Sequence, residues 1–252
     1  MKHRRITLPF TTEWFNHLGQ RLAYSYVRHF MRSDIEWAAD VPTGAKIIAA
    51  NHPTTTDPFV MMAWPLEPIH ILITEQAFKV PAVAQFLHAA GHIPVRAGRG
   101  HEAFNTALNL LQKGKTIGIF PEGALSDEDG DIGEGRTGAV RLAMEANVPI
   151  VPVGVALDWH FVRRHQIRQF GVLETMRWFW LGAYESTVGE AIYFPNTRSY
   201  QESLPYATAL VMQRIHELAQ RSAQRLLNGS WRLTAPAIPV TQLPMRTPVG
   251  AS

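Results

Sequence analysis

The sequence predicts an α/β fold, a layered αβα domain with a mostly parallel central sheet. Short apolar runs typical of buried strands alternate along the chain with amphipathic stretches of helical period. Several of these runs end abruptly in a polar or charged residue, as strands do when they deliver side chains to one edge of a parallel sheet. The chain has 252 residues, of which 46% are hydrophobic and 18% charged, so it is long enough for one large domain or for two small ones.

The first predicted segment, residues 1–40, is an amphipathic helical region. From about residue 12 to residue 32, apolar residues recur at three- and four-residue intervals, with arginines among the polar positions. Such a helix can pack on the domain or lie on a lipid surface. The basic start at residues 1–5 is not followed by the apolar stretch of a signal peptide, and no run of about 18 apolar residues occurs. We therefore expect no membrane-spanning helix, and any membrane role should be peripheral.

The second predicted segment, residues 41–229, holds the strands and helices of the sheet. The predicted strands are residues 45–50, 69–74, 93–96, 116–120, 148–157 and 187–194. The strand at residues 69–74 is apolar almost throughout, as expected when helices cover both faces of a sheet. The predicted helices start near residue 59 and then cover residues 80–89, 102–113, 137–146 and 205–227. Pro81 in a first turn, and Gly91, Gly114 and Gly229 after last turns, mark three of these helices.

Two stretches break this alternation. Residues 159–184 combine aromatic side chains with arginines, which suits a membrane interface, where rings lie at headgroup level and arginines meet phosphates. The same composition also fits a groove for a long apolar chain or an ordinary helical excursion, and the sequence leaves these three interpretations open. Residues 230–252 contain four prolines without periodicity, so we predict a mobile, proline-rich tail.

The composition limits the chemistry that the protein can perform. There is no cysteine, which excludes disulfides, thiolate metal sites and a cysteine nucleophile, and which indicates an intracellular protein. The formal net charge of +3 and the pI of about 9.3 favour an anionic partner such as phosphate, a phospholipid surface or an acidic carrier protein, without requiring nucleic acid. No His-x-x-x-His pair lies on a helix beside a carboxylate, and the acidic stretch 127–131 lacks the glycine and glutamate of a calcium loop. We predict no catalytic metal.

One strand ends in a pair of residues that suits acid–base chemistry. The strand predicted over residues 45–50 runs into His52, and Asp57 follows after four further residues. A histidine held by a carboxylate has a defined tautomer and a stabilised protonated form, so it can act as a general base near neutral pH. Spacing alone does not separate such a pair from two unrelated polar groups. Two other strands end at Arg96 and Glu122, so we expect these side chains at the same edge of the sheet as His52.

Four short motifs follow one another along the predicted domain. They are Asn51-His52-Pro53-Thr54-Thr55-Thr56-Asp57, Gly91-His92-Ile93-Pro94-Val95-Arg96, Phe120-Pro121-Glu122-Gly123 and Val148-Pro149-Ile150-Val151-Pro152-Val153. In order and spacing they resemble the motifs of the glycerolipid acyltransferases, whose best-known members are the 1-acylglycerol-3-phosphate acyltransferases. The resemblance covers roughly residues 40–195 and identifies residues 41–229 as an acyltransferase domain.

The resemblance implies an O-acyltransferase that moves a fatty acyl group from an acyl thioester to the hydroxyl of a lysophospholipid or 1-acylglycerol-3-phosphate in phospholipid synthesis. His52, oriented by Asp57, would take the hydroxyl proton, with no acyl-enzyme and no cofactor. Acyl-CoA or an acyl-carrier protein would be the co-substrate. Arg96 would hold the phosphate of the acceptor. Glu122 and Gly123 would position the acceptor, and a loop-bracing carboxylate is the alternative role for Glu122.

The third motif departs from the family pattern. The family usually continues Phe-Pro-Glu-Gly with Thr-Arg-Ser, whereas this chain has Ala124-Leu125-Ser126. The missing arginine removes a phosphate or loop-bracing contact, so the acceptor stays open between lysophosphatidic acid and another lysophospholipid or lipid alcohol. Arg136, and also Arg99, could compensate for the missing charge.

The resemblance also implies a location and partners. We expect a cytoplasmic protein, peripheral on the inner face of the cell membrane, whose partners are the membrane surface, a lysophospholipid and the acyl donor, and not nucleic acid. Two alternatives stay open. A thioesterase or lipid hydrolase would use the same dyad with water as acceptor, and a non-catalytic lipid-binding protein would use the membrane surface alone.

Overall fold

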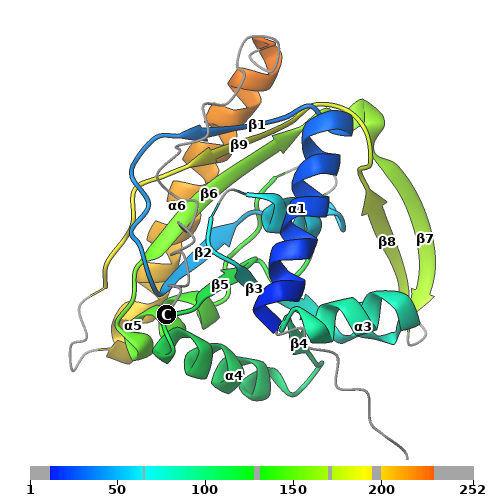
Figure 1. Cartoon of the computed structure of the whole chain (residues 1–252). Helices are drawn as coiled ribbons and strands as arrows, with labels where there is room; N and C mark the ends of the chain where they lie inside the picture. The colour runs from blue at the N-terminus through cyan, green and yellow to red at the C-terminus, as the bar shows by residue number, and fades with distance from the viewer. Residues whose placement is uncertain (1–11, 65, 128–130, 170–171, 195–199, 230–252) are drawn as a thin grey trace, which may run out of the picture.

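The computed structural model describes residues 12–64, 66–127, 131–169, 172–194 and 200–229. Within them, seven strands form one sheet in the order β1-β9-β6-β2-β5-β3-β4. The strands are β1 (Ser33–Trp37), β2 (Lys46–Ala50), β3 (Ile69–Thr74), β4 (Ile93–Val95), β5 (Thr116–Ile119), β6 (Ile150–Leu157) and β9 (Tyr184–Val188). Every neighbouring pair is parallel except β6 and β9, which run antiparallel. The mostly parallel α/β sheet is therefore confirmed (Figure 1).

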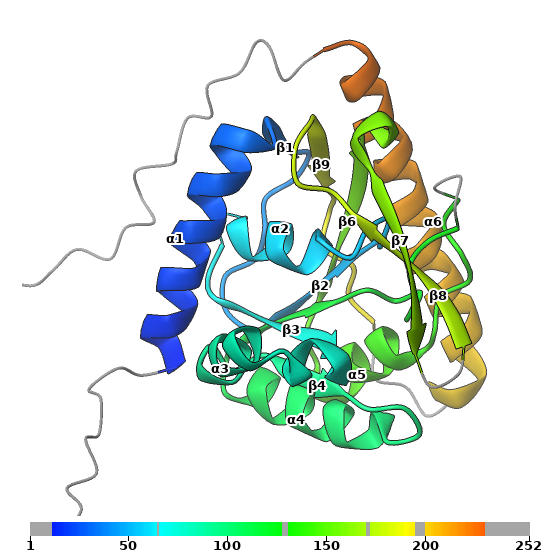
Figure 2. The ribbon, with the colours of Figure 1, turned by 90° about the vertical axis from the view of Figure 1, so that its right-hand side faces the viewer.

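Helices cover both faces of the sheet. They are α1 (Thr12–Phe30), α2 (Asp57–Ala63), α3 (Pro81–Ala89), α4 (Gly100–Gln112), α5 (Gly138–Ala146) and α6 (Tyr200–Leu227). Figure 2 shows α1 and α2 on one side of β2 and β6, and α6 on the other side. Ile48 and Ala50 of β2 pack into the core beneath α1 and α2, whereas Ile47 and Ala49 pack against α4, α5 and α6. All five residues of β2 are buried, which explains why its residues after Lys46 form a continuous apolar run.

The close packing of α6 on the sheet depends on one glycine. A Cβ atom at Gly154, in β6, would lie 1.9 Å from the backbone nitrogen of Ala219 in α6. Only glycine allows the backbones of helix and strand to approach this closely. The long helix therefore rests directly on the central strand.

Two strand predictions differ from the structure. β1 lies within the segment expected to be helical up to residue 40, and its sequence Ser-Asp-Ile-Glu-Trp carries no apolar run because it is a partly exposed strand at the sheet edge. The last strand, β9, covers Tyr184–Val188 rather than residues 187–194. Ile192, which follows β9 in the sequence, forms only an isolated antiparallel bridge to Ile150. The predicted strand combined the end of β9 with this bridge.

The aromatic and basic stretch 159–184 folds mainly as a hairpin. A short 3₁₀ turn, η2 (Trp159–Phe161), leads into β7 (Arg163–Gln169), which pairs with β8 (Val172–Trp178) in a separate two-stranded antiparallel sheet. A helical excursion is therefore wrong for this stretch, whereas the membrane-interface and groove interpretations stay predictions. A second 3₁₀ turn, η1 (Glu75–Lys79), follows β3. The tail predicted at residues 230–252 lies outside the described residues.

Candidate active site

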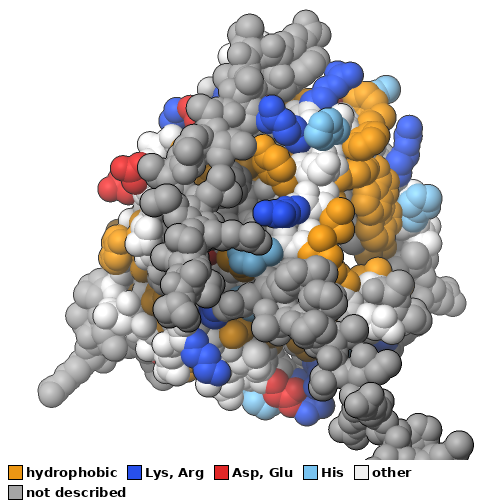
Figure 3. All heavy atoms as spheres, viewed as in Figure 1, with side chains coloured by type: hydrophobic (Ala, Val, Ile, Leu, Met, Phe, Trp, Pro, Cys, Tyr) orange, Lys and Arg blue, Asp and Glu red, His pale blue; other side chains and the backbone are white. Residues whose placement is uncertain are grey.

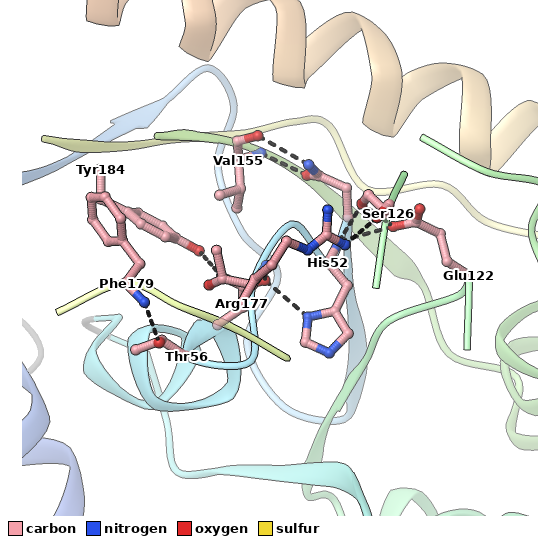
Figure 4. A network of polar contacts seen from close by, with 11 residues as sticks. His52, Thr56, Glu122, Ser126, Val155, Arg177, Phe179 and Tyr184 are labelled. Atoms are coloured by element: carbon pink, nitrogen blue, oxygen red, sulfur yellow. Dashed lines mark hydrogen bonds and ion pairs between the residues drawn. The ribbon is translucent and has the colours of Figure 1, made fainter. Parts of the chain in front are cut away.

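Two loops at one edge of the sheet carry the predicted site. The dyad loop, residues 51–57, leads from β2 into α2, and the third-motif loop, residues 120–127, follows β5. Because β2 and β5 are neighbouring parallel strands, both loops leave the sheet at the same edge. Figure 4 shows side chains of the two loops next to one another, with Arg177 reaching them from β8.

His52 and Asp57 form the expected pair. Nδ1 of His52 lies 2.9 Å from Oδ2 of Asp57, whose side chain is only 2% exposed. Oδ2 also accepts a hydrogen bond of 2.7 Å from the backbone N–H of Thr54, and Oδ1 accepts one of 2.6 Å from the Thr54 hydroxyl. The Tyr184 phenol donates a fourth hydrogen bond, of 3.0 Å, to Oδ1. Four donors thus fix the orientation of the carboxylate.

The imidazole of His52 is oriented so that Nε2, the nitrogen that does not contact Asp57, is available to a substrate. The ring stacks on Phe120, with ring centroids 4.1 Å apart and an interplanar angle of 15°. The bond of Nδ1 to Asp57 places a proton on Nδ1 and leaves Nε2 as the basic atom. No described protein atom forms a hydrogen bond with Nε2, and the side chain is 17% exposed. A small group from a substrate could therefore reach the basic nitrogen.

Glu122 braces the backbone of His52. Its Oε1 accepts a hydrogen bond of 2.8 Å from the His52 N–H and one of 2.9 Å from the Ser126 hydroxyl, while Oε2 accepts one of 3.0 Å from the Gly133 N–H. The Ser126 N–H in turn donates to the His52 carbonyl over 2.8 Å. The loop-bracing role of Glu122 is therefore present in the structure, and its contact with an acceptor stays a prediction.

Gly123 and Arg136 lie against each other. Gly123 has a φ of +69°, and a Cβ atom there would lie 2.6 Å from Nε of Arg136. The position therefore needs glycine both for its backbone conformation and for the space that Arg136 occupies. The Arg136 N–H donates to the Pro121 carbonyl over 2.8 Å, which holds the arginine beside the third-motif loop. Among the described residues, no carboxylate forms an ion pair with Arg136.

Arg96 lies at the end of β4, but two carboxylates occupy its guanidinium. Nε lies 2.7 Å from Glu75 and Nη1 lies 3.2 Å from Glu102. The hydrogen bond with Glu75 is the largest cause of a raised pKa for Arg96. Arg99 also pairs with Glu102. To hold a phosphate, Arg96 would have to exchange these partners, and its phosphate-binding role stays a prediction.

The sequence did not assign a role to three residues that shape the site. Asn51 forms a two-way hydrogen-bonded pair with the backbone of Val155 in β6, through Nδ2 to the carbonyl at 3.0 Å and Oδ1 to the N–H at 2.7 Å. Tyr184 and Arg177 appeared in the sequence only as members of the aromatic and basic stretch. Both lie more than a hundred residues from the dyad loop, so no local pattern connects them with it.

The described part of the chain shows neither a metal-binding cluster nor a membrane-spanning helix. There, no three His, Asp or Glu side chains gather as ligands for a metal ion. None of the helices in the same residues is long and apolar enough to cross a membrane.

Comparisons with known proteins show which family the chain resembles. Residues 32–156 match the model of the protein family described as Acyltransferase, a range that contains both loops of the site. The chain is 32% identical over 85 residues to a 1-acyl-sn-glycerol-3-phosphate acyltransferase of Bacillus subtilis (strain 168). The aligned region covers 33% of this chain and 41% of that protein. A protein of the same name from Borreliella burgdorferi is 31% identical over 110 residues, or 42% of this chain and 44% of that one. The chain thus spans less than half of the length of these curated relatives.

A solved structure shares the fold. The 1-acyl-sn-glycerophosphate (LPA) acyltransferase PlsC from Thermotoga maritima superposes with a TM-score of 0.56, over 82% of this chain and 79% of that one. The two sequences are 20% identical over this match. At this identity the similarity shows the fold alone.

Proposed function

Because this chain belongs to the Acyltransferase family, whose model matches residues 32–156, we propose that it is a glycerolipid O-acyltransferase. It would move a fatty acyl group from an acyl thioester to the free hydroxyl of a lysophospholipid, and 1-acylglycerol-3-phosphate is the first acceptor to test. The observation that carries the proposal is the His52–Asp57 pair, joined over 2.9 Å, with the carboxylate held by three further hydrogen bonds and Nε2 available.

The proposed step needs a base and no protein nucleophile. Nε2 of His52 takes the proton of the acceptor hydroxyl while its oxygen attacks the thioester carbonyl, and Asp57 stabilises the imidazolium that forms. The tetrahedral intermediate then collapses, so that a C–O bond has formed and the C–S bond breaks. The imidazolium returns the proton to the departing thiolate. The products are an ester and a thiol, and the dyad ends in its starting state.

The charged end of the acceptor would meet a cation near the third-motif loop. Arg136 lies beside Gly123, next to Glu122, and has no carboxylate partner among the described residues. Arg96 is engaged with Glu75 and Glu102. A phosphate would therefore displace fewer existing contacts at Arg136, and we propose Arg136 as the principal anchor of the headgroup, with Arg96 as the second candidate.

A lipid substrate requires access to a membrane surface. Figure 3 shows hydrophobic side chains beside Lys, Arg and His side chains on the face that carries α1. The exposed apolar residues include Leu22 and Phe30 of α1 and Trp180 and Leu181 after β8. Exposed aliphatic and aromatic groups combined with basic residues suit the interface of an anionic bilayer. This supports the proposal of a peripheral protein on the inner face of the cell membrane.

A direct assay tests the proposal. Purified protein is incubated with labelled acyl-CoA or acyl-carrier protein and a panel of lysophospholipids, and the products are identified by mass. We expect a diacyl product that depends on the acceptor and disappears in His52→Ala. Release of free fatty acid at the full rate without any acceptor would instead indicate a thioesterase. Lipid binding without either reaction, for both donors and all acceptors, would instead indicate a non-catalytic lipid-binding protein.

A further inference from the structure

The hairpin strand β8 continues into a segment that contacts both loops of the site. Residues 177–179 lie between the dyad loop and the third-motif loop, and Figure 4 shows Arg177 and Phe179 reaching the two loops. β7 and β8 form their own sheet and are not part of the seven-stranded sheet. The contacts of residues 177–179 therefore join the hairpin to the catalytic loops.

The side chain of Arg177 holds the third-motif loop. It is 3% exposed, and its guanidinium lies 5.8 Å from the centre of the Trp159 ring. Nη1 donates to the carbonyl of Asp127 over 2.8 Å, and Nη2 donates to the carbonyl of Ser126. Ser126 in turn donates its N–H to the carbonyl of His52. The Arg177 guanidinium therefore holds Ser126, and Ser126 in turn holds the backbone of His52, the proposed base.

The backbone of the same segment holds the dyad loop. The Thr55 N–H donates to the carbonyl of Arg177 over 2.7 Å. The Phe179 N–H donates to the hydroxyl oxygen of Thr56 over 3.0 Å. Thr55 and Thr56 lie between His52 and Asp57 in the sequence, so these two bonds locate the turn that folds the carboxylate back onto the imidazole.

We propose that Arg177 is a positioning residue, which ties the third-motif loop to the dyad loop and so sets the position of His52. The inference rests on the proposed acyl transfer, because the role of Arg177 is defined by what the dyad does. Arg177 acts on the site through its contacts with Ser126, Asp127 and Thr55. The family motif arginine is absent at Leu125, and Arg177 supplies a cation that braces the same loop from another strand.

The role predicts a loss in turnover rather than in substrate binding. Misplacement of a catalytic group by about 1 Å can lower a rate by about 100-fold. We expect Arg177→Met, which keeps much of the side-chain volume but removes every hydrogen-bond donor of the side chain, to lower kcat by at least about tenfold. The KM values for the acyl donor and the acceptor should stay within about twofold. Arg177→Lys keeps one charged donor and should recover part of the rate. Arg214 is the control, since it is an exposed arginine on α6, outside both loops and the hairpin, and Arg214→Met should behave like the wild type.

A second measurement does not depend on catalysis. The amide hydrogens of Thr55 and Ser126 are bonded within this arrangement, so hydrogen exchange reports directly on it. In Arg177→Met or Arg177→Lys we expect faster exchange at both amides and unchanged exchange in β6. If Arg177→Met does not fold, Arg177→Lys alone decides between these outcomes. Unchanged exchange, an unchanged kcat, or a loss carried by KM would overturn the role of Arg177.

The two proposals fail in different ways. If the wild type performs no acyl transfer with any donor or acceptor, the proposed function is wrong. The exchange rates of the Thr55 and Ser126 amides in the Arg177 variants then test whether Arg177 couples the two loops. If the wild type transfers acyl groups and Arg177→Met matches it in kcat and exchange, only the role of Arg177 fails.

Discussion

The phenol of Tyr184, at the start of β9, donates a 3.0 Å hydrogen bond to Oδ1 of Asp57, although 127 residues separate the two in the sequence. Burial, followed by the charge of Asp57, raises the pKa of Tyr184 well above its usual value, so the phenol stays a donor throughout the physiological range. The side of the carboxylate away from His52 is therefore held in part by a strand that is far from it in the sequence.

Tyr184→Phe should test this bond with little change in shape. The variant leaves Asp57 with one donor fewer, which we expect to cost about 1–2 kcal/mol in the free energy of unfolding. Turnover should fall about three- to tenfold, because a less constrained carboxylate orients His52 less well, while KM values stay close to those of the wild type. Denaturant unfolding and steady-state kinetics check both effects. A variant that loses stability but keeps the full kcat would show that Tyr184 supports the fold alone.

His52→Ala should abolish most of the proposed activity. General base catalysis contributes about 10²–10⁴ in rate, so kcat should fall by that factor while the circular dichroism spectrum and the unfolding midpoint change little. His101→Ala is the control, because His101 is exposed on α4. Turnover near the wild-type level in His52→Ala would rule out the dyad mechanism.

The two candidate anchors of the headgroup should respond differently. We expect Arg136→Ala to raise the KM of a phosphate-bearing acceptor by about tenfold, the loss of one charge-assisted hydrogen-bonding group, with little effect on the donor KM. Arg96→Ala should have a smaller effect on that KM, since its guanidinium already binds Glu75 and Glu102. Steady-state kinetics with both substrates varied give these values. The opposite order would make Arg96 the anchor, and equal rises for donor and acceptor would exclude a headgroup role for either arginine.

Stability should decrease in mild acid because of His92. Burial, with a smaller contribution from repulsion by His70, lowers the pKa of His92 from 6.5 to about 4. Its Nδ1 accepts the Ile71 N–H over 3.2 Å, an arrangement that a protonated ring would lose. Between pH 6.5 and about 4 the unfolded chain therefore binds a proton that the folded protein does not, and the free energy of unfolding falls as the pH falls. The full effect is roughly 3 kcal/mol, and it is absent above pH 6.5.

His92→Gln checks this dependence. Denaturant unfolding at pH 7.5, 5.5 and 4.5 should show a weaker pH dependence for the variant than for the wild type, whatever the variant's stability at pH 7.5. His101→Gln, with an exposed histidine, should keep the wild-type slope. Parallel curves for His92→Gln and the wild type would exclude His92 as the source.

The fold was predictable because its strands are distinctive along the chain. Strands buried on both faces, such as β2 and β6, consist almost wholly of apolar residues and alternate with helical periods. β1 escaped this pattern because an edge strand is paired on one side only and keeps polar residues. The sequence did not predict the β7–β8 hairpin, because the mixture of aromatic and basic residues in the stretch 159–184 fits several structures equally well.

By itself the sequence determined the class of fold and the order of the motifs, because these depend on local pattern and on strands that end at one edge of a sheet. The resemblance of the four motifs to a known family then predicted the pairing of His52 with Asp57, which their spacing alone did not. Only the tertiary structure decided which groups hold that pair. Tyr184, Arg177 and the backbone of Phe179 come from segments more than a hundred residues away, and no local spacing encodes a contact made across the fold. The tertiary structure also distinguished Arg96, which two carboxylates already bind, from Arg136, because ion pairing depends on distance in space.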